Sequence, residues 1–535
     1  VEVYANGLSL GQAVLDEKSN MGAARTFKWR FEALVEANIS VGSELQFCAR
    51  LDDRSELTTF YVAEGAEAWQ EKNAGKDDDL CYAKTGKTLT AHFSEPAYSD
   101  AALQIIRGAN LMPSPKATVL LVVHNLNAIE RGEKRRALNT LRRDLNTRGV
   151  ELIVLHHSKS ASGCDIPEIN FFDPELTRLS KDSENSLLAI DPSVLDYAQR
   201  MLYGFTFALN RRPKNWGDIE KQILDEGSKV SAAVKAVQPS LVLLWHQWNS
   251  LMILARAISD GLSIPSAIMH EGMLPGTMTI DEHGMMAESS ALGALLLDDD
   301  DDNRNFLERA DRVIAEIKGK KLDRKPFEGT PAGKDVIQNL KARGARTVFY
   351  AGINDWQSGN LPADHSRAKI HSPYFQDTDE GLKCLLDVAE ESDFYVVYKP
   401  HPNLFPRTAV LKNPRLIYVR EANATECIMQ VDVMATILSS LAYISLAHGV
   451  PTVLMGRNTL SETGAAYELN SKEDLSGCLN AALKGADSEE KKICFRRHVA
   501  ALLKSHLYPY GGKTDFAALS EKDSADRILQ MIPNA

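Results

Sequence analysis

Residues 117–123 read Ala-Thr-Val-Leu-Leu-Val-Val, an apolar run that only Thr118 interrupts. A strand of a parallel sheet is covered on both faces, so it carries apolar side chains without the alternation of a half-exposed strand. A basic amphipathic helix is expected next, at about 128–147, and then a second strand at 151–155. The stretch therefore predicts a strand–helix–strand unit and an α/β fold.

The same alternation continues along the chain and then starts again. After 155, the patterns predict helices at 193–211, 216–237 and 250–260 and strands at 241–245 and 266–270. Beyond a polar connection rich in Pro and Gly at 319–335, they predict strands at 346–351, 394–399, 415–419, 431–435 and 451–456, with helices at 378–391, 424–429 and 440–448. We therefore expect two tandem Rossmann-like domains, at 116–325 and 335–535, with ligands at the carboxyl ends of their strands.

The N-terminal part of the chain has a different pattern. Residues 1–65 alternate like half-buried strands and contain the tight-turn signal Asn6-Gly7, which predicts a small antiparallel β-sandwich as an accessory module. Residues 66–115 are polar and are predicted to be a linker. Because the chain begins at Val1, without a methionine and within an expected strand, we expect it to be part of a longer polypeptide.

Composition excludes several classes of protein. The 535 residues are 44% hydrophobic and 25% charged, unlike a disordered or collagen-like chain. Sixty-one basic and 72 acidic residues leave a net charge of −11, which argues against a nucleic-acid partner. The seven scattered cysteines favour reduced thiols in the cytoplasm over disulfides or a zinc site. No apolar stretch approaches the ~20 residues that span a bilayer.

Two elements of the second domain are suited to an anion. Lys399 and His401 follow the strand 394–399 in the turn Lys-Pro-His-Pro, which places a cation and an imidazole where a phosphate or carboxylate could bind. Ser439 and Ser440 precede the helix 440–448, where hydroxyl and backbone N–H groups could bind a second anionic group. The alternatives are a surface turn with a capping histidine and a serine that only caps its helix.

Two carboxylates are candidates for chemistry. Asp355 follows the strand 346–351 in a loop that contains Gly352 and Asn354 and continues to Ser372. Glu271 follows the strand 266–270 of the first domain, and shielding between the domains would raise its pKa as a proton donor requires. The alternatives are a turn residue for Asp355 and a solvated loop residue for Glu271.

Together these elements resemble the retaining β-Kdo glycosyltransferases of capsule and O-antigen synthesis, which have the GT-B architecture of two facing Rossmann-like domains. The resemblance covers about residues 117–530 and rests on the Lys399–Pro402 turn, the Ser439–Ser440 helix start with Gly449-Val450-Pro451, the run from Glu271 to Asp281, and the Gly352–Asp355 loop. It implies CMP-β-Kdo as donor substrate, no metal and no further cofactor.

The same resemblance implies roles for the candidate residues. Asp355 would be the nucleophile that forms a covalent sugar adduct, with Asp281 as the fallback carboxylate, and Glu271 would transfer the acceptor's proton. The donor would be held by the remaining candidates, namely Lys399, His401, Ser439, Ser440, Asn354, Gly352 and Ser372.

Other functions stay open. The Lys-Pro-His-Pro and Ser-Ser elements are also similar to those of polyglycerol-phosphate polymerases, so a CDP-glycerol-type phosphotransferase is one alternative. A non-catalytic carbohydrate-binding protein is another. As a glycosyltransferase, the protein is expected in the cytoplasm at the inner face of the bacterial inner membrane, with an oligosaccharide or lipid-linked glycan as acceptor. Basic side chains near Arg135 and Lys491 are candidate membrane contacts, with solvated helix faces as the alternative.

Overall fold

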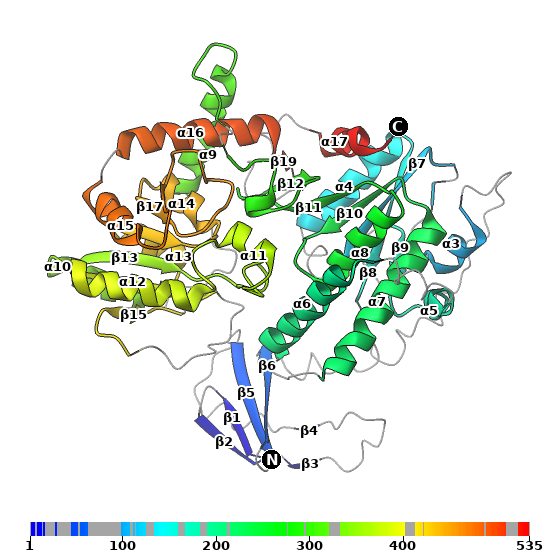
Figure 1. Ribbon diagram of the computed structural model, residues 1–535, viewed down its shortest axis with the longest axis horizontal. Coiled ribbons are helices and arrows are strands. Elements are labelled where there is room, and N and C mark those ends of the chain that lie inside the picture. The colour runs from blue at the N-terminus through cyan, green and yellow to red at the C-terminus, as the bar shows by residue number, and fades with distance from the viewer. Residues whose placement is uncertain are drawn as a thin grey trace. The chain divides into compact units, whose positions relative to one another are not determined.

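A computed structural model describes the fold of this chain (Figure 1). The described residues are 2–5, 8–12, 14–15, 27–28, 44–51, 54–61, 98–107, 111–112, 114–124, 133–158, 166–181, 190–210, 215–274, 276–293, 296–319, 332–401, 412–420, 422–485, 488–509 and 523–533. The predicted linker up to residue 97, the centre of the predicted inter-domain connection and Pro402 lie outside them. The chain divides into two compact units, Val1–Lys87 and Thr88–Ala535.

The first unit is antiparallel, as the sequence predicts. One sheet has four strands in the order β2-β1-β5-β6, and β3 pairs with β4. The strands of this unit are β1 (Glu2–Ala5), β2 (Leu8–Gln12), β3 (Val14–Leu15), β4 (Phe27–Lys28), β5 (Glu44–Leu51) and β6 (Arg54–Tyr61). The packing of two sheets into a sandwich stays a prediction.

The second unit contains two sheets, and we call the parts built around them the first and second lobes. The sheet of the first lobe has the order β19-β12-β11-β10-β7-β8-β9. Its strands are β7 (Ala117–Val123), β8 (Val150–His156), β9 (Glu168–Asn170), β10 (Leu241–Trp245), β11 (Ser266–Glu271), β12 (Thr277–Asp281) and β19 (Tyr508–Pro509). The strands from β11 to β9 are parallel to one another. At the edge of the sheet, β12 pairs antiparallel with β11, and β19 pairs antiparallel with β12.

The apolar run at 117–123 is covered on both faces, as predicted. Leu120 and Val122 pack into the core on one face of the sheet, and Val119 and Leu121 into the core on the other. The first face is covered by α3 (Asp100–Ile105), α5 (Pro174–Lys181), α6 (Pro192–Asn210), α7 (Trp216–Val237) and α8 (Ser250–Gly261). The second is covered by α4 (Glu133–Thr147) and α17 (Ser524–Met531).

The sheet of the second lobe is parallel throughout. Its order is β15-β14-β13-β16-β17-β18. The strands are β13 (Arg346–Ala351), β14 (Phe394–Lys399), β15 (Leu416–Tyr418), β16 (Val433–Thr436), β17 (Thr452–Leu454) and β18 (Tyr467–Glu468). Every strand predicted between residues 346 and 456 is present, which confirms the second Rossmann-like sheet.

Helices also cover both faces of this second sheet. One core contains residues of α9 (Arg304–Gly319), α10 (Ala332–Ala342), α13 (Ala424–Ile428), α14 (Leu441–Ala447) and α16 (Ser488–Ser505). The opposite core contains residues of α12 (Thr378–Ser392) and α15 (Leu475–Lys484). The short helices η3 (Met286–Glu288) and α11 (Ser366–His371) contact each other. None of the helices in the described part of the chain combines the length and the hydrophobicity that a membrane span requires.

The lobes exchange segments, which the predicted boundaries 116–325 and 335–535 do not describe. Helix α9 precedes the second sheet but contacts α16 and lies in the core of the second lobe. The C-terminal β19 and α17 belong to the first lobe, where α17 lies beside α4 in Figure 1. Helix α3 lies within the range predicted as a linker, yet Ala102 and Ile105 are buried in the core of the first lobe. That part of the linker prediction is wrong, because those apolar side chains pack on the sheet.

Candidate active site

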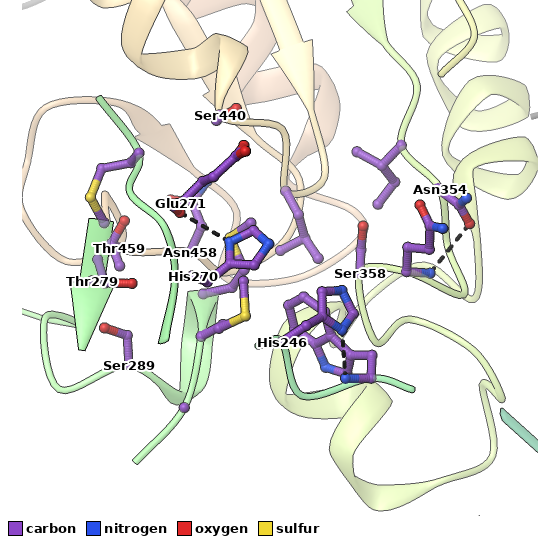
Figure 2. A pocket seen from close by; sticks show the side chains of 18 of the residues that line it. His246, His270, Glu271, Thr279, Ser289, Asn354, Ser358, Ser440, Asn458 and Thr459 are labelled. Carbon is purple, nitrogen blue, oxygen red and sulfur yellow. Dashed lines mark hydrogen bonds between the residues drawn. The ribbon is translucent and has the colours of Figure 1, made fainter. Parts of the chain in front are cut away.

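A cavity of about 410 Å³ lies between the two lobes (Figure 2). Most of its lining residues lie at or after the carboxyl ends of β10 and β11 in the first lobe and of β13, β14, β16 and β17 in the second. Loops at this edge of a parallel sheet are free of the sheet's own pairing, so their side chains are available to a ligand. The predicted location of the site, in a cleft between the two lobes, agrees with this cavity.

Glu271 is the only carboxylate among the described residues that line the cavity. It ends β11, and the residue before it, His270, lies with its Nδ1 atom 3.0 Å from the backbone oxygen of Glu271. Figure 2 shows Glu271 on the side of the cavity where Ser440, Asn458 and Thr459 lie. A carboxylate in this position could accept a proton from a bound hydroxyl group.

Imidazoles and indoles form much of the first-lobe wall. His124, His246 and His270 line it, together with Trp245 and Trp248. Burial lowers the pKa of His246 to about 4, and burial followed by the neighbouring His157 lowers that of His124 to about 4. Both imidazoles are therefore neutral at pH 7. Across the described residues, no group of three or more His, Cys, Asp or Glu side chains is placed to hold a metal ion.

His246 has an unusual backbone for a residue with a large side chain. Its φ is +98°, a conformation that L-residues seldom adopt outside functional sites and tight turns. The Nδ1 atom accepts a hydrogen bond from the backbone N–H of Trp248 at 3.0 Å, which orients the ring. The strained turn after β10 thus directs an imidazole into the cavity.

The second-lobe wall contains no carboxylate, ammonium or guanidinium group among the described residues, and its polar side chains are amides, hydroxyls and one imidazole. The loop after β13 contributes Asn354, Gln357 and Ser358, and His401 follows β14. Further polar side chains come from the ends of β16 and β17, namely Ser439, Ser440, Asn458 and Thr459. These amides and hydroxyls can donate or accept hydrogen bonds, as recognition of a phosphate or a polyhydroxylated ligand requires.

The structure brings five of the nine predicted site residues together. These are Glu271, His401, Ser439, Ser440 and Asn354, which all line the cavity. Ser439 lines the cavity and also accepts a hydrogen bond from the N–H of Leu441 in the first turn of α14 at 3.3 Å, so a local structural contact and a place in the cavity wall are compatible.

The prediction that Asp355 faces the cleft is wrong. Its side chain is buried and is absent from the described cavity wall. One carboxylate oxygen, Oδ1, accepts hydrogen bonds from the backbone N–H of Thr378 at 3.1 Å, its hydroxyl at 3.0 Å and Asn360 Nδ2 at 3.2 Å. The carboxylate is directed to the start of α12, because a cluster of donors there satisfies it. Burial raises its pKa to about 7, although the hydrogen bonds from Thr378 oppose that rise.

Three further predicted residues have local contacts and do not line the cavity. The ammonium group of Lys399 donates to the backbone oxygen of Arg420 at 2.8 Å. The hydroxyl of Ser372 donates to the backbone oxygen of Phe375 at 2.5 Å. A Cβ atom on Gly352 would lie 3.0 Å from the Tyr398 ring, so this glycine permits β13 and β14 to approach closely.

The fallback carboxylate, Asp281, is buried and is not among the described residues that line the cavity. It accepts hydrogen bonds from Ser289 and from the backbone N–H and hydroxyl of Ser290, at 2.7–2.9 Å. Burial acts to raise its pKa, but these hydrogen bonds, that of His283 and the nearby His506 lower it overall. Asp281 therefore stabilises the turn after β12.

Sequence reasoning missed several lining residues. His246, His270, Asn458, Thr459 and Gln357 line the cavity but are not among the predicted site residues. Their shared signal is position, since each lies at or shortly after the end of a strand whose neighbours also supply site residues. That rule selects more loop residues than can reach one cavity, and only the folded loops distinguish them.

No family model matches the sequence, and no curated protein matches it. Solved structures with a similar arrangement include KpsC, the β-Kdo 2,7 transferase of Thermosulfurimonas dismutans, at 17% identity and a TM-score of 0.34, covering 57% of this chain and 88% of that one. A glycotransferase of kitacinnamycin gives 13% identity and a TM-score of 0.32, covering 79% and 100%. UDP-GlcNAc 2-epimerase from Neisseria meningitidis gives 12% and 0.32, covering 72% and 97%.

What defines the class is the chain's own topology, an α/β protein with two Rossmann-like lobes and a cavity at the carboxyl ends of both sheets.

Proposed function

We propose that this protein is a glycosyltransferase that uses a nucleotide-activated sugar, with Glu271 as the general base. The observation that carries the proposal is the position of Glu271, a carboxylate on the first-lobe wall of a cavity whose second-lobe wall offers hydroxyl, amide and imidazole groups. A donor held by the second lobe would then present its reacting carbon towards an acceptor held by the first.

The proposed reaction is a direct displacement. The acceptor hydroxyl attacks the anomeric carbon, the bond from that carbon to the phosphate oxygen breaks, and the hydroxyl proton passes to Glu271. His401, Ser439 and Ser440 would stabilise the departing phosphate by hydrogen bonds. The retaining route through a covalent adduct on Asp355 is not part of the proposal, because that carboxylate is held at α12. A single displacement inverts the configuration at the anomeric carbon.

CMP-Kdo is the first donor to test. This choice rests on the sequence motifs around Glu271, His401 and Ser439. All three of these residues line the cavity. CDP-glycerol is the second, because the motifs around His401 and Ser439 are shared with phosphotransferases that use it. The acceptor would be a surface-polysaccharide glycan, free or lipid-linked.

The test is a consumption screen with CMP-Kdo, other CMP-linked ulosonic acids and CDP-glycerol in the presence of glycan acceptors. We expect release of CMP from a CMP-sugar, and a fall of about 10²–10⁴-fold in kcat for Glu271→Gln with an unchanged unfolding temperature. Glu282→Gln is the matched control, since that half-exposed glutamate lies beyond β12 and outside the described cavity wall.

Three results would contradict the proposal. Consumption of CDP-glycerol alone would identify a phosphotransferase. Full activity in Glu271→Gln would remove the proposed base. Calorimetry that detects no affinity for any cytidine or uridine nucleotide would favour a carbohydrate-binding protein without catalysis.

A further inference from the structure

The loop that joins β13 to the residues before α11 supplies three polar groups to the cavity, Asn354, Gln357 and Ser358. Asp355 lies between them in sequence but points the opposite way, into the protein. The loop thus presents three polar side chains to the cavity and the carboxylate of Asp355 to the protein interior. The interior-facing side chain is the feature that has no role in the proposed displacement.

The carboxylate of Asp355 ties this loop to the first turn of α12. Its three donors are the N–H and hydroxyl of Thr378 and the side-chain amide of Asn360. The backbone oxygen of Asp355 accepts two more hydrogen bonds, from the N–H of Asn360 at 3.0 Å and that of Leu361 at 3.3 Å. Thr378 is itself fixed to the sheet, because its backbone oxygen accepts a hydrogen bond from the Tyr350 hydroxyl at 3.1 Å.

The other side of the loop rests on the first lobe. The indole of Trp356 lies so close to Gly204 of α6 that a Cβ atom there would overlap it. In the reverse sense, a Cβ atom on Gly359, where φ is +78°, would overlap the indole of Trp248. The loop is therefore held from two directions, by hydrogen bonds to α12 and by close packing against the first lobe.

We infer that Asp355 is a positioning residue, whose buried carboxylate holds the loop 353–360 so that Asn354, Gln357 and Ser358 face the bound ligand. The effect on turnover rests on the proposed function, whereas the effect on the loop does not. Displacement of a positioned group by about 1 Å can lower a rate by about 10²-fold, so support of this kind affects catalysis without contact with substrate.

The test compares Asp355→Ala, Asp355→Asn and Thr378→Val, singly and as the double variant Asp355→Ala/Thr378→Val. We expect Asp355→Ala and Thr378→Val each to lower kcat/KM by about 10–100-fold, and the double variant to be no worse than the more severe single one, because both remove the same link. Asp355→Asn keeps an oxygen that can accept from Thr378 and should stay within about tenfold of the unchanged protein. Thr378→Ser should restore the activity lost in Thr378→Val.

A second readout does not depend on turnover. Hydrogen exchange at the amides of Asn360 and Leu361 should accelerate by at least tenfold in Asp355→Ala and in Thr378→Val, and less in Asp355→Asn. Asp387→Ala, at an exposed position on α12, is the matched control and should change neither readout.

Several outcomes would overturn the inference. A loss of more than about 10³-fold in Asp355→Asn, with Thr378→Val unaffected, would mean that the carboxylate takes part in the chemistry. Unchanged exchange at Asn360 and Leu361 in Asp355→Ala would mean that it does not hold the loop. If the unchanged protein consumes no nucleotide sugar while exchange responds as expected, the proposed function fails and the structural role of Asp355 stands.

Discussion

The carboxylate of Glu288 accepts hydrogen bonds from Arg367, from Nε at 2.8 Å and from Nη2 at 3.0 Å. Glu288 ends η3, beside the first-lobe wall of the cavity, and Arg367 lies on α11, which follows the loop of Asp355. His371 Nε2 lies 3.4 Å from the same carboxylate, and the Gln247 side-chain amide donates to it at 2.5 Å. This largely buried pair joins the two lobes next to the cavity.

The Glu288–Arg367 pair predicts a loss of stability in acid. Burial acts to raise the pKa of Glu288, but His371 and Arg367 lower it overall to about 2. Because the folded pKa lies below the ordinary 4.5, this contribution is complete above pH 4.5 and is lost as the pH falls towards 2. We expect Glu288→Gln to lower the free energy of unfolding at pH 7 by about 3 kcal/mol and to flatten the acid limb.

Urea unfolding between pH 2 and 7 measures this effect. Asp301→Asn is the control, since Asp301 pairs with Arg304 at an exposed site and should change stability by less than about 1 kcal/mol. A parallel acid limb in Glu288→Gln and the unchanged protein would show that this pair does not cause the pH dependence.

The raised pKa of Asp355 predicts that the free energy of unfolding depends on pH with the opposite sign. Its folded pKa of about 7 lies above the ordinary 3.8, so the folded state retains its proton to higher pH than the unfolded state. The charged form is the disfavoured one, and stability should fall as the pH rises from about 4 to 7. Asp355→Asn removes this titration and should gain on the unchanged protein across that range, by up to roughly 4 kcal/mol. If the difference in unfolding free energy between Asp355→Asn and the unchanged protein does not vary between pH 4 and 7, the carboxylate of Asp355 does not have a raised pKa in the folded state.

The contact between Trp356 and Gly204 predicts that one helical glycine cannot be replaced. Gly204→Ala inserts a methyl group where the indole lies, so we expect a loss of about 1–3 kcal/mol and weaker ligand binding. Gly477→Ala is the matched change, because no atom beyond its chain neighbours and the nearby backbone of α15 lies within 4 Å of its Cβ position. That variant should be stabilised by about 0.4–1 kcal/mol. Thermal unfolding and calorimetry compare the two, and equal behaviour would exclude a close interlobe contact.

Tyr443 links the cavity wall to α16 through its hydroxyl group. Its hydroxyl forms hydrogen bonds with Thr459 at 2.7 Å and with His498 Nε2 at 2.8 Å. Tyr443→Phe removes both bonds from a buried site, so we expect a loss of about 1–3 kcal/mol in urea unfolding. The half-buried Tyr374, changed to Phe, is the control. If both variants unfold alike, the network around Tyr443 contributes nothing measurable.

Much of the fold could be predicted because burial on both faces leaves a simple pattern. The runs 117–123, 241–245 and 346–351 each became a strand with those bounds, and the helix predicted at 216–237 is α7. Short elements such as β9 and β18 were missed, because two or three residues carry no periodicity.

Part of the site followed from the same rule. Glu271 and His401 were placed in the cavity because each follows a strand of a parallel sheet, and strand ends converge at one edge. Asp355 follows β13 in the same way and faces inward. The difference lies in Thr378, whose donors are 23 residues further along the chain and meet Asp355 only after folding.

The amino-acid sequence alone determined the two strand–helix alternations and the sheet edge at which polar side chains gather, because hydrophobic periodicity and strand direction are local properties. Tertiary structure alone decided that α9 packs on the second sheet, that α17 returns to the first and that Asp355 supports a loop. An amphipathic helix specifies that it must cover an apolar surface but not which one, and a loop carboxylate turns towards whichever donors the fold brings near.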